Sequence, residues 1–490
     1  MNDPALLDRT RPAPGARLRG FDDLPGPRGL PLLGNLLQID STRLHLQLER
    51  WSERYGATFR LRLGKRRAIV VSDHRVIAAA LRDRPDGYRR TARLEAIGAE
   101  MGLKGGVFSA NGEAWRRQRR MVMHGFDPAH IRRYFPSMQR VADHLAERWQ
   151  AAARTGAPID LQTDLMRFTV DTIAGLAFGA QVDTLRSDGD VIQAHLNRIF
   201  PALFSRSFAA LPTWRFMPSA ADRALVRSVA AVDAAVDGFI AQARERLRAD
   251  PALRDQPDNL LEAMLVAADA PDSGINDTQV AGNVLTMLLA GEDTTANTLA
   301  WAIHLLWRHP QALARATDEV RTHCHADRAP TLEALGRLDY VEACLNETMR
   351  LKPVAPINTM QALRDTTLGD VRVAAGMLVI ALMRHDATSE RHVPRAAAFE
   401  PERWLAHDNE PGTLKRVSMP FGAGPRICPG RYLALLEMKM ALATLLSRFE
   451  IRCVDTVDGR EPRELLQLAM GPVGLRMRIA VRSVHDPSSS

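Results

Sequence analysis

The chain carries four cysteines, and only one of them lies in a setting that suggests chemistry. None forms a CxxC pair, and four cysteines are too few for a disulfide scaffold in 490 residues, so a reducing compartment fits. A cysteine in such a chain is ordinarily a buried, inert thiol. Cys428 differs because it follows the glycine-, proline- and arginine-rich segment 421–427 and directly precedes Pro429 and Gly430.

The residues around this cysteine match a known pattern. Five specified positions of FxxGxRxCxG fall within ten residues, which rarely happens by chance, so a glycine-rich surface turn with an incidental cysteine is a poor alternative. The segment resembles the cysteine loop of the cytochrome P450 superfamily, in its soluble bacterial type. The matching positions are Phe421, Gly424, Arg426, Cys428 and Gly430.

The resemblance implies a haem-thiolate monooxygenase with haem b as cofactor. Cys428 would be the iron ligand, and its thiolate would push electron density onto the metal and favour O–O cleavage. Arg426 would pair with a haem propionate. The helix after Pro429 would aim its positive N-terminus at the sulfur. Glycines permit close approach to the porphyrin, and the expected cofactor-binding residues of the loop are Phe421, Gly422, Arg426, Cys428 and Gly430.

A second segment, 290–295, reads AGEDTT and resembles the family motif AGx(D/E)T(T/S). By this resemblance, Ala290 and Gly291 contact the cofactor, and the glycine leaves room for dioxygen. Thr294 would hydrogen-bond the dioxygen, and Asp293 would relay protons as a general acid, so these two are the expected catalytic residues. The structural alternative is a threonine bonded back to a helix carbonyl and an aspartate in a surface ion pair.

Three further motifs resemble the family, and one position departs from it. Glu347-Thr-Met-Arg350 resembles ExxR and, with Arg403 of a PERW segment, is expected to form a buried ion-pair network of structural rather than catalytic role. Trp115 and Arg119 share a helical face and are expected to reach haem propionates, although a solvent-facing basic helix is the alternative. Many bacterial relatives carry a further propionate-binding arginine nine or ten residues after ExxR, where this chain has Thr359 and Met360.

The elements that position these motifs are mainly helical. Helical periodicity dominates residues 72–350, after a helix at 42–55 and a β-hairpin formed by 58–63 and 68–71; strands return near 367–382 and 464–482. A long helix is predicted over 277–308, capped by Asn276 and Gln279 and ended by Pro310. At 1.5 Å per residue it would span roughly 48 Å, and its middle, Val284 to Ala290, is apolar on nearly all sides and therefore expected to be buried.

The fold class expected is mainly α with small β-sheets. It is a single-domain cytochrome P450 fold, with the haem between a long central helix and the cysteine-ligand loop. Residues 1–20 are expected to be a loose tail and residues 21–490 the haem domain, with no part left for a fused reductase. No apolar run begins the chain, so a cytoplasmic enzyme without a transmembrane segment is expected.

The net charge of +8 is spread along the chain, so a nucleic-acid partner is not expected. Much of the charge can be an ordinary solvated surface. The sharper expectation is a basic docking face for a ferredoxin or flavodoxin that is reduced by an NAD(P)H reductase. A peroxide-dependent or isomerase-type haem-thiolate enzyme and a non-catalytic haem sensor remain alternatives. The docking face would comprise Arg116, Arg117, Arg120, Lys415, Arg416, Arg431 and Lys439.

By resemblance, five segments line the substrate pocket: 88–110, 196–217, 284–295, 354–360 and 467–471. Their side chains are mostly apolar, so the expected organic substrate is a hydrophobic small molecule. The resemblance implies O2 as the second substrate. The stretch 200–217 is open to two interpretations, a mobile lid or a packed loop. The apolar lining residues expected are Phe200, Phe204, Phe208, Leu289, Val354, Ile357 and Met470.

Overall fold

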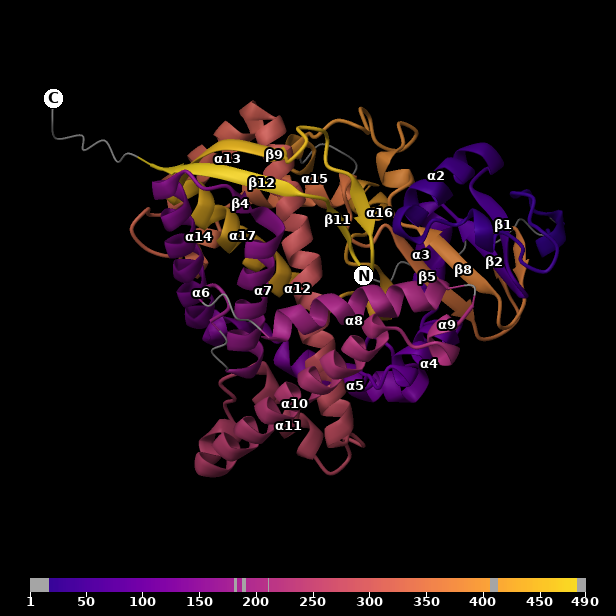
Figure 1. Cartoon of the computed structure of the whole chain (residues 1–490), viewed down its shortest axis with the longest axis horizontal. Helices are drawn as coiled ribbons and strands as arrows, with labels where there is room; N and C mark the ends of the chain where they lie inside the picture. The colour runs from indigo at the N-terminus through magenta and orange to yellow at the C-terminus, as the bar shows by residue number, and fades with distance from the viewer. Residues whose placement is uncertain (1–16, 180–182, 187–190, 210, 406–412, 483–490) are drawn as a thin grey trace.

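The longest helix, α12 (Asp277–Arg308), runs through the middle of the molecule in the computed structural model (Figure 1). Asn276 caps it by accepting a 2.9 Å hydrogen bond from the backbone N–H of Gln279, whose side chain accepts a 3.0 Å bond in return. Helices α7, α10, α15 and α17 pack against α12. The predicted ends and caps of this helix are therefore confirmed.

The structure describes residues 17–179, 183–186, 191–209, 211–405 and 413–482. Within them helices predominate, which confirms the predicted fold class. The predicted helix at 42–55 is α2. Most of the helices form the large helical body around α12, whereas α2 lies beside the main sheet (Figure 1). The α-helices other than α12 are α2 (Leu44–Tyr55), α3 (His74–Arg82), α4 (Ala92–Glu100), α5 (Gly112–Gly125), α6 (Pro128–Thr155), α7 (Leu161–Phe178), α8 (Val191–Phe208), α9 (Thr213–Phe216), α10 (Ala220–Ala249), α11 (Leu260–Asp269), α13 (Pro310–His323), α14 (Leu332–Leu335), α15 (Asp339–Leu351), α16 (Thr413–Val417) and α17 (Arg431–Arg448).

The main sheet lies to one side of the helical body, with strand order β1-β2-β8-β5-β3 (Figure 1). The predicted hairpin is present, with β1 and β2 antiparallel and β2 parallel to β8. Smaller sheets join β4, β12 and β9, β10 with β11, and β6 with β7. The strands are β1 (Thr58–Leu63), β2 (Arg66–Val71), β3 (Tyr88–Arg89), β4 (Ile159–Asp160), β5 (Ile357–Ala362), β6 (Thr366–Leu368), β7 (Val371–Val373), β8 (Leu378–Leu382), β9 (Phe449–Thr456), β10 (Glu464–Leu466), β11 (Met470–Pro472) and β12 (Leu475–Val481).

Most of the predicted N-terminal tail, residues 1–16, lies outside the described residues. Arg19, within the predicted tail, pairs with Asp370 at 2.7 Å. Among the described helices, none combines the length and the apolar character needed to cross a bilayer.

Candidate active site

The cysteine loop is closed by a backbone hydrogen bond and is pressed against α3. The N–H of Cys428 donates to the carbonyl of Phe421 at 2.9 Å. Gly424 adopts φ +71°, and a Cβ there would lie 2.5 Å from the carbonyl oxygen of Leu81 in α3. Gly422 adopts φ +76°, also in the left-handed region. Both glycines are therefore required by the backbone path, which brings the loop against α3 and Cys428 to the start of α17.

The thiol of Cys428 lies where a thiolate can be stabilised. Burial raises the pKa of this thiol above its usual value, and the N–H of Gly430 and the charges of Arg119 and Arg431 offset part of that rise. Gly430 is also the N-cap of α17, so the positive end of that helix dipole is directed toward the sulfur. Pro429 offers no N–H, which leaves Gly430 as the neighbouring backbone donor. Metal binding would complete the deprotonation of this thiol.

Two predicted propionate ligands, Trp115 and Arg119, lie on α5 beside the cysteine loop. The guanidinium of Arg426 stacks over the ring of Trp115, with 4.7 Å between its central carbon and the ring centroid. Arg426 also donates to the carbonyl of Ala110 at 2.5 Å, and Arg119 donates to the carbonyl of Ile427 at 2.8 Å. The structure thus brings the predicted residues together on one side of Cys428.

Two further arginines join this group, and the sequence analysis did not single them out. Burial and repulsion from neighbouring arginines lower the pKa of Arg84 to about 8 and that of Arg426 to about 9, and burial lowers the pKa of Arg90 to about 10. In the described chain, the Nε atoms of all three are buried without a hydrogen-bond partner. Three such cations remain protonated at neutral pH and call for an anion between them. The two propionates of a haem fit this cradle.

Helix α12 presents Ala290, Asp293 and Thr294 to a cavity. Thr294 donates to the carbonyl of Ala290 at 2.7 Å, the back-bonded arrangement considered as the structural alternative. Ala290 itself is exposed, so the prediction of burial through to Ala290 is wrong at its last residue. Its exposure follows from its place in the cavity wall.

The carboxyl group of Asp293 is held without a basic partner among the described residues. Burial raises its pKa to about 6, although Asn297 donates to it at 2.5 Å and the backbone of Ala469 also hydrogen-bonds it. The alternative of a surface ion pair is therefore not what the structure shows. A carboxyl group that titrates near neutral pH can both receive and release protons.

Gly291 is glycine for a reason different from the one expected. It does not line the cavity, and a Cβ at this position would lie 2.3 Å from Cδ1 of Ile173 in α7. The absence of a side chain lets α7 and α12 approach each other closely. Of the neighbouring residues Ala290 and Gly291, Ala290 lines the cavity and Gly291 does not. The expectation that Gly291 makes room for dioxygen is corrected accordingly.

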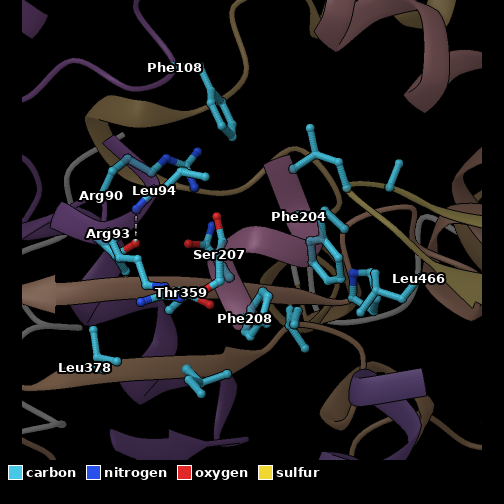
Figure 2. Close-up of a pocket in the computed structure, with 18 of the residues that line it drawn as sticks. Arg90, Arg93, Leu94, Phe108, Phe204, Ser207, Phe208, Thr359, Leu378 and Leu466 are labelled. Carbon is cyan, nitrogen blue, oxygen red and sulfur yellow. Dashed lines mark hydrogen bonds between the residues drawn. The ribbon is translucent and has the colours of Figure 1, made fainter. Parts of the chain in front are cut away.

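The cavity has a volume of about 270 Å³ and is mostly apolar (Figure 2). All five predicted segments contribute to it. Phe200 and Met470 do not line it, because both are buried in the core. Figure 2 shows Phe204 and Phe208 on one helix and Arg90 and Arg93 across from them. The lining residues are Leu36, Ile39, Leu63, Arg66, Arg90, Thr91, Arg93, Leu94, Phe108, Phe204, Ser207, Phe208, Leu289, Ala290, Asp293, Thr294, Val354, Ala355, Pro356, Ile357, Asn358, Thr359, Leu378, Ile380, Leu466, Leu468 and Ala469.

The predicted ion-pair network is present, with Glu347 and Arg350 fully buried and Arg403 10% exposed. Glu347 accepts from Arg350 at 2.7 Å and 2.8 Å, from Arg403 at 2.9 Å and from Trp404 at 2.8 Å. Arg350 also donates to the carbonyl of Ala387 at 2.7 Å. Burial would raise the pKa of Glu347, but these partners hold it below its usual value. The network ties α15 to the segment that precedes the cysteine loop.

A half-buried thiol at a helix start, a cradle of arginines and an acid on a long central helix together define a haem-binding, oxygen-activating enzyme. Residues 24–478 match the cytochrome P450 family. The chain therefore belongs to the cytochrome P450 family, and it is a haem-thiolate monooxygenase.

Individual relatives and solved structures agree with this assignment. The chain is 28% identical over 485 residues to the chloroplastic carotene epsilon-monooxygenase of Arabidopsis thaliana, covering 93% of this chain and 86% of that one. It is 29% identical to a self-sufficient cytochrome P450 monooxygenase of Oidiodendron maius, covering 95% of this chain and 42% of that one. The crystal structure of the cytochrome P450DA heme domain superposes with a TM-score of 0.81 at 25% identity, covering 95% of this chain and 99% of that one.

Proposed function

We propose that Cys428 is the axial ligand of haem b in this enzyme. The observation that carries the proposal is the cysteine loop, where the half-buried thiol of Cys428 faces the Gly430 N–H and the start of α17. Beside it lie arginines whose Nε atoms have no hydrogen-bond partner among the described residues. Bound haem iron activates O2 so that one oxygen atom can be inserted into an organic substrate. The residues of the chain hold the cofactor, orient the substrate and move protons.

The arginine cradle would hold the haem propionates. Arg426, Arg119 and Trp115 fill the predicted positions, and Arg84 and Arg90 supply the charge that is lacking at Thr359. Arg90 follows β3, whose Arg89 pairs with Gln361 of β5, and it lines the same cavity as Thr359. Arg90 would therefore supply, from the end of β3, the charge that an arginine near position 359 would bring.

Asp293 and Thr294 would deliver the protons that reduction of O2 consumes. Asp293 lies in the cavity wall and has a pKa of about 6, so a useful fraction of the group is protonated at neutral pH. Thr294 is one residue away and also lines the cavity. Its hydroxyl could turn away from the carbonyl of Ala290, accept a proton from Asp293 and donate its own proton into the cavity.

The reaction would be hydroxylation or epoxidation, with electrons from NAD(P)H through a separate ferredoxin or flavodoxin. The balance is one substrate, one O2, one NAD(P)H and one proton giving oxygenated substrate, water and NAD(P)+. Both electrons must reach the haem from outside the cavity. The proton-delivery pair in the cavity favours this O2-dependent reaction over peroxide use.

The basic docking face is the side of α5 and the start of α17. Arg116, Arg120 and Arg431 are exposed there, although Arg116 is paired with two acids. Lys439 was expected to belong to this face, and that expectation is wrong, because Lys439 is buried and pairs with Glu342 at 2.5 Å.

Charge reversal tests the docking face. Arg120→Glu should slow reduction by an acidic ferredoxin at low salt, with the difference shrinking as salt screens it. Arg227→Glu, an exposed site on α10, is the matched control. Equal rates and equal salt dependence in the two variants would show that the face is elsewhere.

The substrate would be a small molecule with an apolar body. The phenylalanines and aliphatic residues of the cavity favour hydrophobic contact, and Arg66 adds one half-buried cation. Burial and the nearby charge of Arg93 lower the pKa of Arg66, and no acid pairs with it in the described chain. A substrate that carries an acidic or strongly polar group at one end would supply that partner.

The decisive test is the difference spectrum of the dithionite-reduced protein with carbon monoxide. A strongly red-shifted Soret band is expected for the native protein and for Cys453→Ser, which changes a cysteine on β9 far from the loop in sequence. Cys428→Ser should lose that band. A band typical of histidine ligation in the native protein would overturn the proposed ligand.

A further inference from the structure

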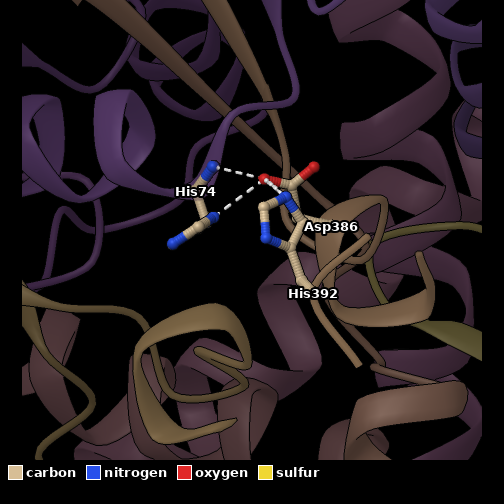
Figure 3. Close-up of side chains that lie close together, drawn as sticks. All are labelled: His74, Asp386 and His392. Atoms are coloured by element: carbon tan, nitrogen blue, oxygen red, sulfur yellow. Dashed lines mark hydrogen bonds and ion pairs between the residues drawn. The ribbon is translucent and has the colours of Figure 1, made fainter. Parts of the chain in front are cut away.

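Outside the active site, three imidazoles converge on one carboxylate. His74 begins α3, Asp386 lies in the short 3-10 helix Asp386–Thr388, and His392 follows six residues later (Figure 3). Nδ1 of His74 lies 2.9 Å from Oδ2 of Asp386, and Nε2 of His392 lies 3.5 Å from the same oxygen. Nδ1 of His385 lies 3.2 Å from the other oxygen, Oδ1.

Oδ2 of Asp386 also accepts the backbone N–H of His74 at 2.9 Å, and Arg75 acts on its charge from further away. The side chain of Asp386 is 11% exposed, and no lysine or arginine among the described residues lies within 4.0 Å of its oxygens. Burial would raise its pKa, but hydrogen bonds from His385 and His74 hold the pKa well below the usual range. The carboxylate of Asp386 is thus a group of low exposure that faces ring nitrogens able to bind a metal ion.

We propose that His74, Asp386 and His392 bind one zinc ion. Their ligand atoms all lie within 4.8 Å of one another. Tetrahedral zinc with bonds near 2.1 Å holds its ligand atoms about 3.4 Å apart. The 2.9 Å and 3.5 Å separations from Oδ2 bracket that value, and the two imidazole nitrogens lie within 4.8 Å of each other.

The three proposed ligand side chains favour zinc over other metal ions. Two imidazoles and one carboxylate suit zinc, whereas calcium and magnesium require more oxygen ligands and copper(I) favours sulfur. Water would complete the fourth position. His385 acts as a positioning residue, because its ring nitrogen holds Oδ1 and thereby orients Oδ2 toward the ion. The side chains of His74 and His392 are 14% and 26% exposed, which leaves a path for the ion.

The ion would join two elements that support the cysteine loop. The far end of α3 touches the loop where Gly424 meets Leu81. On the other side, Asp386 precedes Ala387, whose carbonyl accepts from the buried Arg350. Zinc binding would stabilise the loop side of the protein without entering the catalytic cavity. We expect a higher thermal midpoint with zinc and unchanged carbon monoxide difference spectra.

Zinc titration of the haem-loaded protein tests the site. After chelator treatment and dialysis, calorimetry should show one zinc ion per chain, and metal analysis after gel filtration should retain it. His392→Gln should abolish binding, and His385→Ala should weaken it about 10–100-fold. His325→Ala, an exposed histidine, is the matched control and should bind like the native chain. The spectrum of each reduced variant with carbon monoxide checks that its fold is intact.

X-ray absorption at the zinc edge gives a readout that depends on no variant. Two imidazoles with oxygen ligands support the assignment, whereas sulfur ligation would place zinc at a cysteine and overturn it. The proposal is also overturned if native protein takes up no zinc, or if His74→Gln and His392→Gln both bind as the native chain does. None of these results depends on the proposed monooxygenase reaction.

Discussion

Replacing Asp293 by asparagine should lower activity and raise stability at once. Burial holds the pKa of this carboxyl at about 6 instead of 3.8. Ionising it in the folded protein therefore costs about 3 kcal/mol more than in the unfolded chain. Asparagine has no such cost, but it offers one acceptor where Asn297 and Ala469 now bond two carboxyl oxygens, which should cost about 1 kcal/mol. The net gain in the free energy of unfolding at pH 7–8 is about 2 kcal/mol.

The sign of the pH dependence follows from the raised pKa of Asp293. The native state binds the proton more tightly than the unfolded state, so native stability falls as pH rises from about 4 to about 6 and stays low above that. The advantage of Asp293→Asn should therefore be largest at pH 8 and roughly half as large at pH 5, before the lost hydrogen bond is subtracted. For a chain of this size we expect roughly 2–4 °C in the thermal midpoint at pH 8.

Activity should move the opposite way. Loss of a general acid typically costs 10²–10⁴-fold, so oxygenated product should fall while NAD(P)H is still consumed. The assay measures thermal melts at pH 5 and pH 8. Product formed and NAD(P)H consumed are measured on the same samples. Asp272→Asn, an exposed and unpaired acid, is the control. A variant that is equally destabilised at both pH values, or one that retains full product yield, would refute the reasoning.

Three more perturbations test other parts of the site. Pro429→Leu should raise the haem reduction potential in a redox titration, because leucine adds a backbone N–H that can bond the sulfur; a lower or unchanged potential contradicts this. Arg350→Leu should cost about 3–5 kcal/mol and accelerate haem loss, since it removes the buried cation from Glu347 and leaves Arg403 as its one remaining basic partner among the described residues; haem transfer to apomyoglobin measures the rate. Gly291→Ala should cost about 1–3 kcal/mol by overpacking, and Ile173→Val should restore part of it in thermal melts; no rescue would mean that packing is not the reason for the glycine.

Local signals in the sequence predicted the parts of the fold that depend on local interactions. The ends of α12 follow from the capping pair Asn276 and Gln279 and from Pro310, all within a few residues of the helix. The hairpin follows from alternation around Gly64 and Lys65. The two-residue strands β3 and β4 were missed, because their hydrogen bonds come from partners far away in the sequence.

The site was predicted where motif spacing determines it and missed where tertiary charge pairing determines it. Arg84 stands beside Asp83 in the sequence, so it looks neutralised. In the fold, Asp83 pairs with Arg364 and Asp86 pairs with Arg116, which leaves Arg84 without an acid. No pattern of adjacent charges reveals such a choice of partners. Gly291 was misread for a similar reason, since only the packed structure shows that it faces Ile173.

The threonine at position 359, close to where many bacterial relatives carry an arginine, fits a positive charge that Arg90 supplies from another segment. Thr359 and Arg90 line the same cavity, and Arg90 also belongs to the cradle around Arg426. An arginine at position 359 would add another cation to a cluster of arginines that already repel one another. With threonine at position 359, the charge comes from Arg90, the residue after β3. The central guanidinium carbon of Arg90 lies 4.2 Å from the ring centroid of Phe108. Arg90 belongs to both the cavity wall and the arginine cradle. A substrate that displaces Phe108 would therefore disturb the side chain that is proposed to hold a propionate. Substrate binding would then be coupled to the environment of the haem.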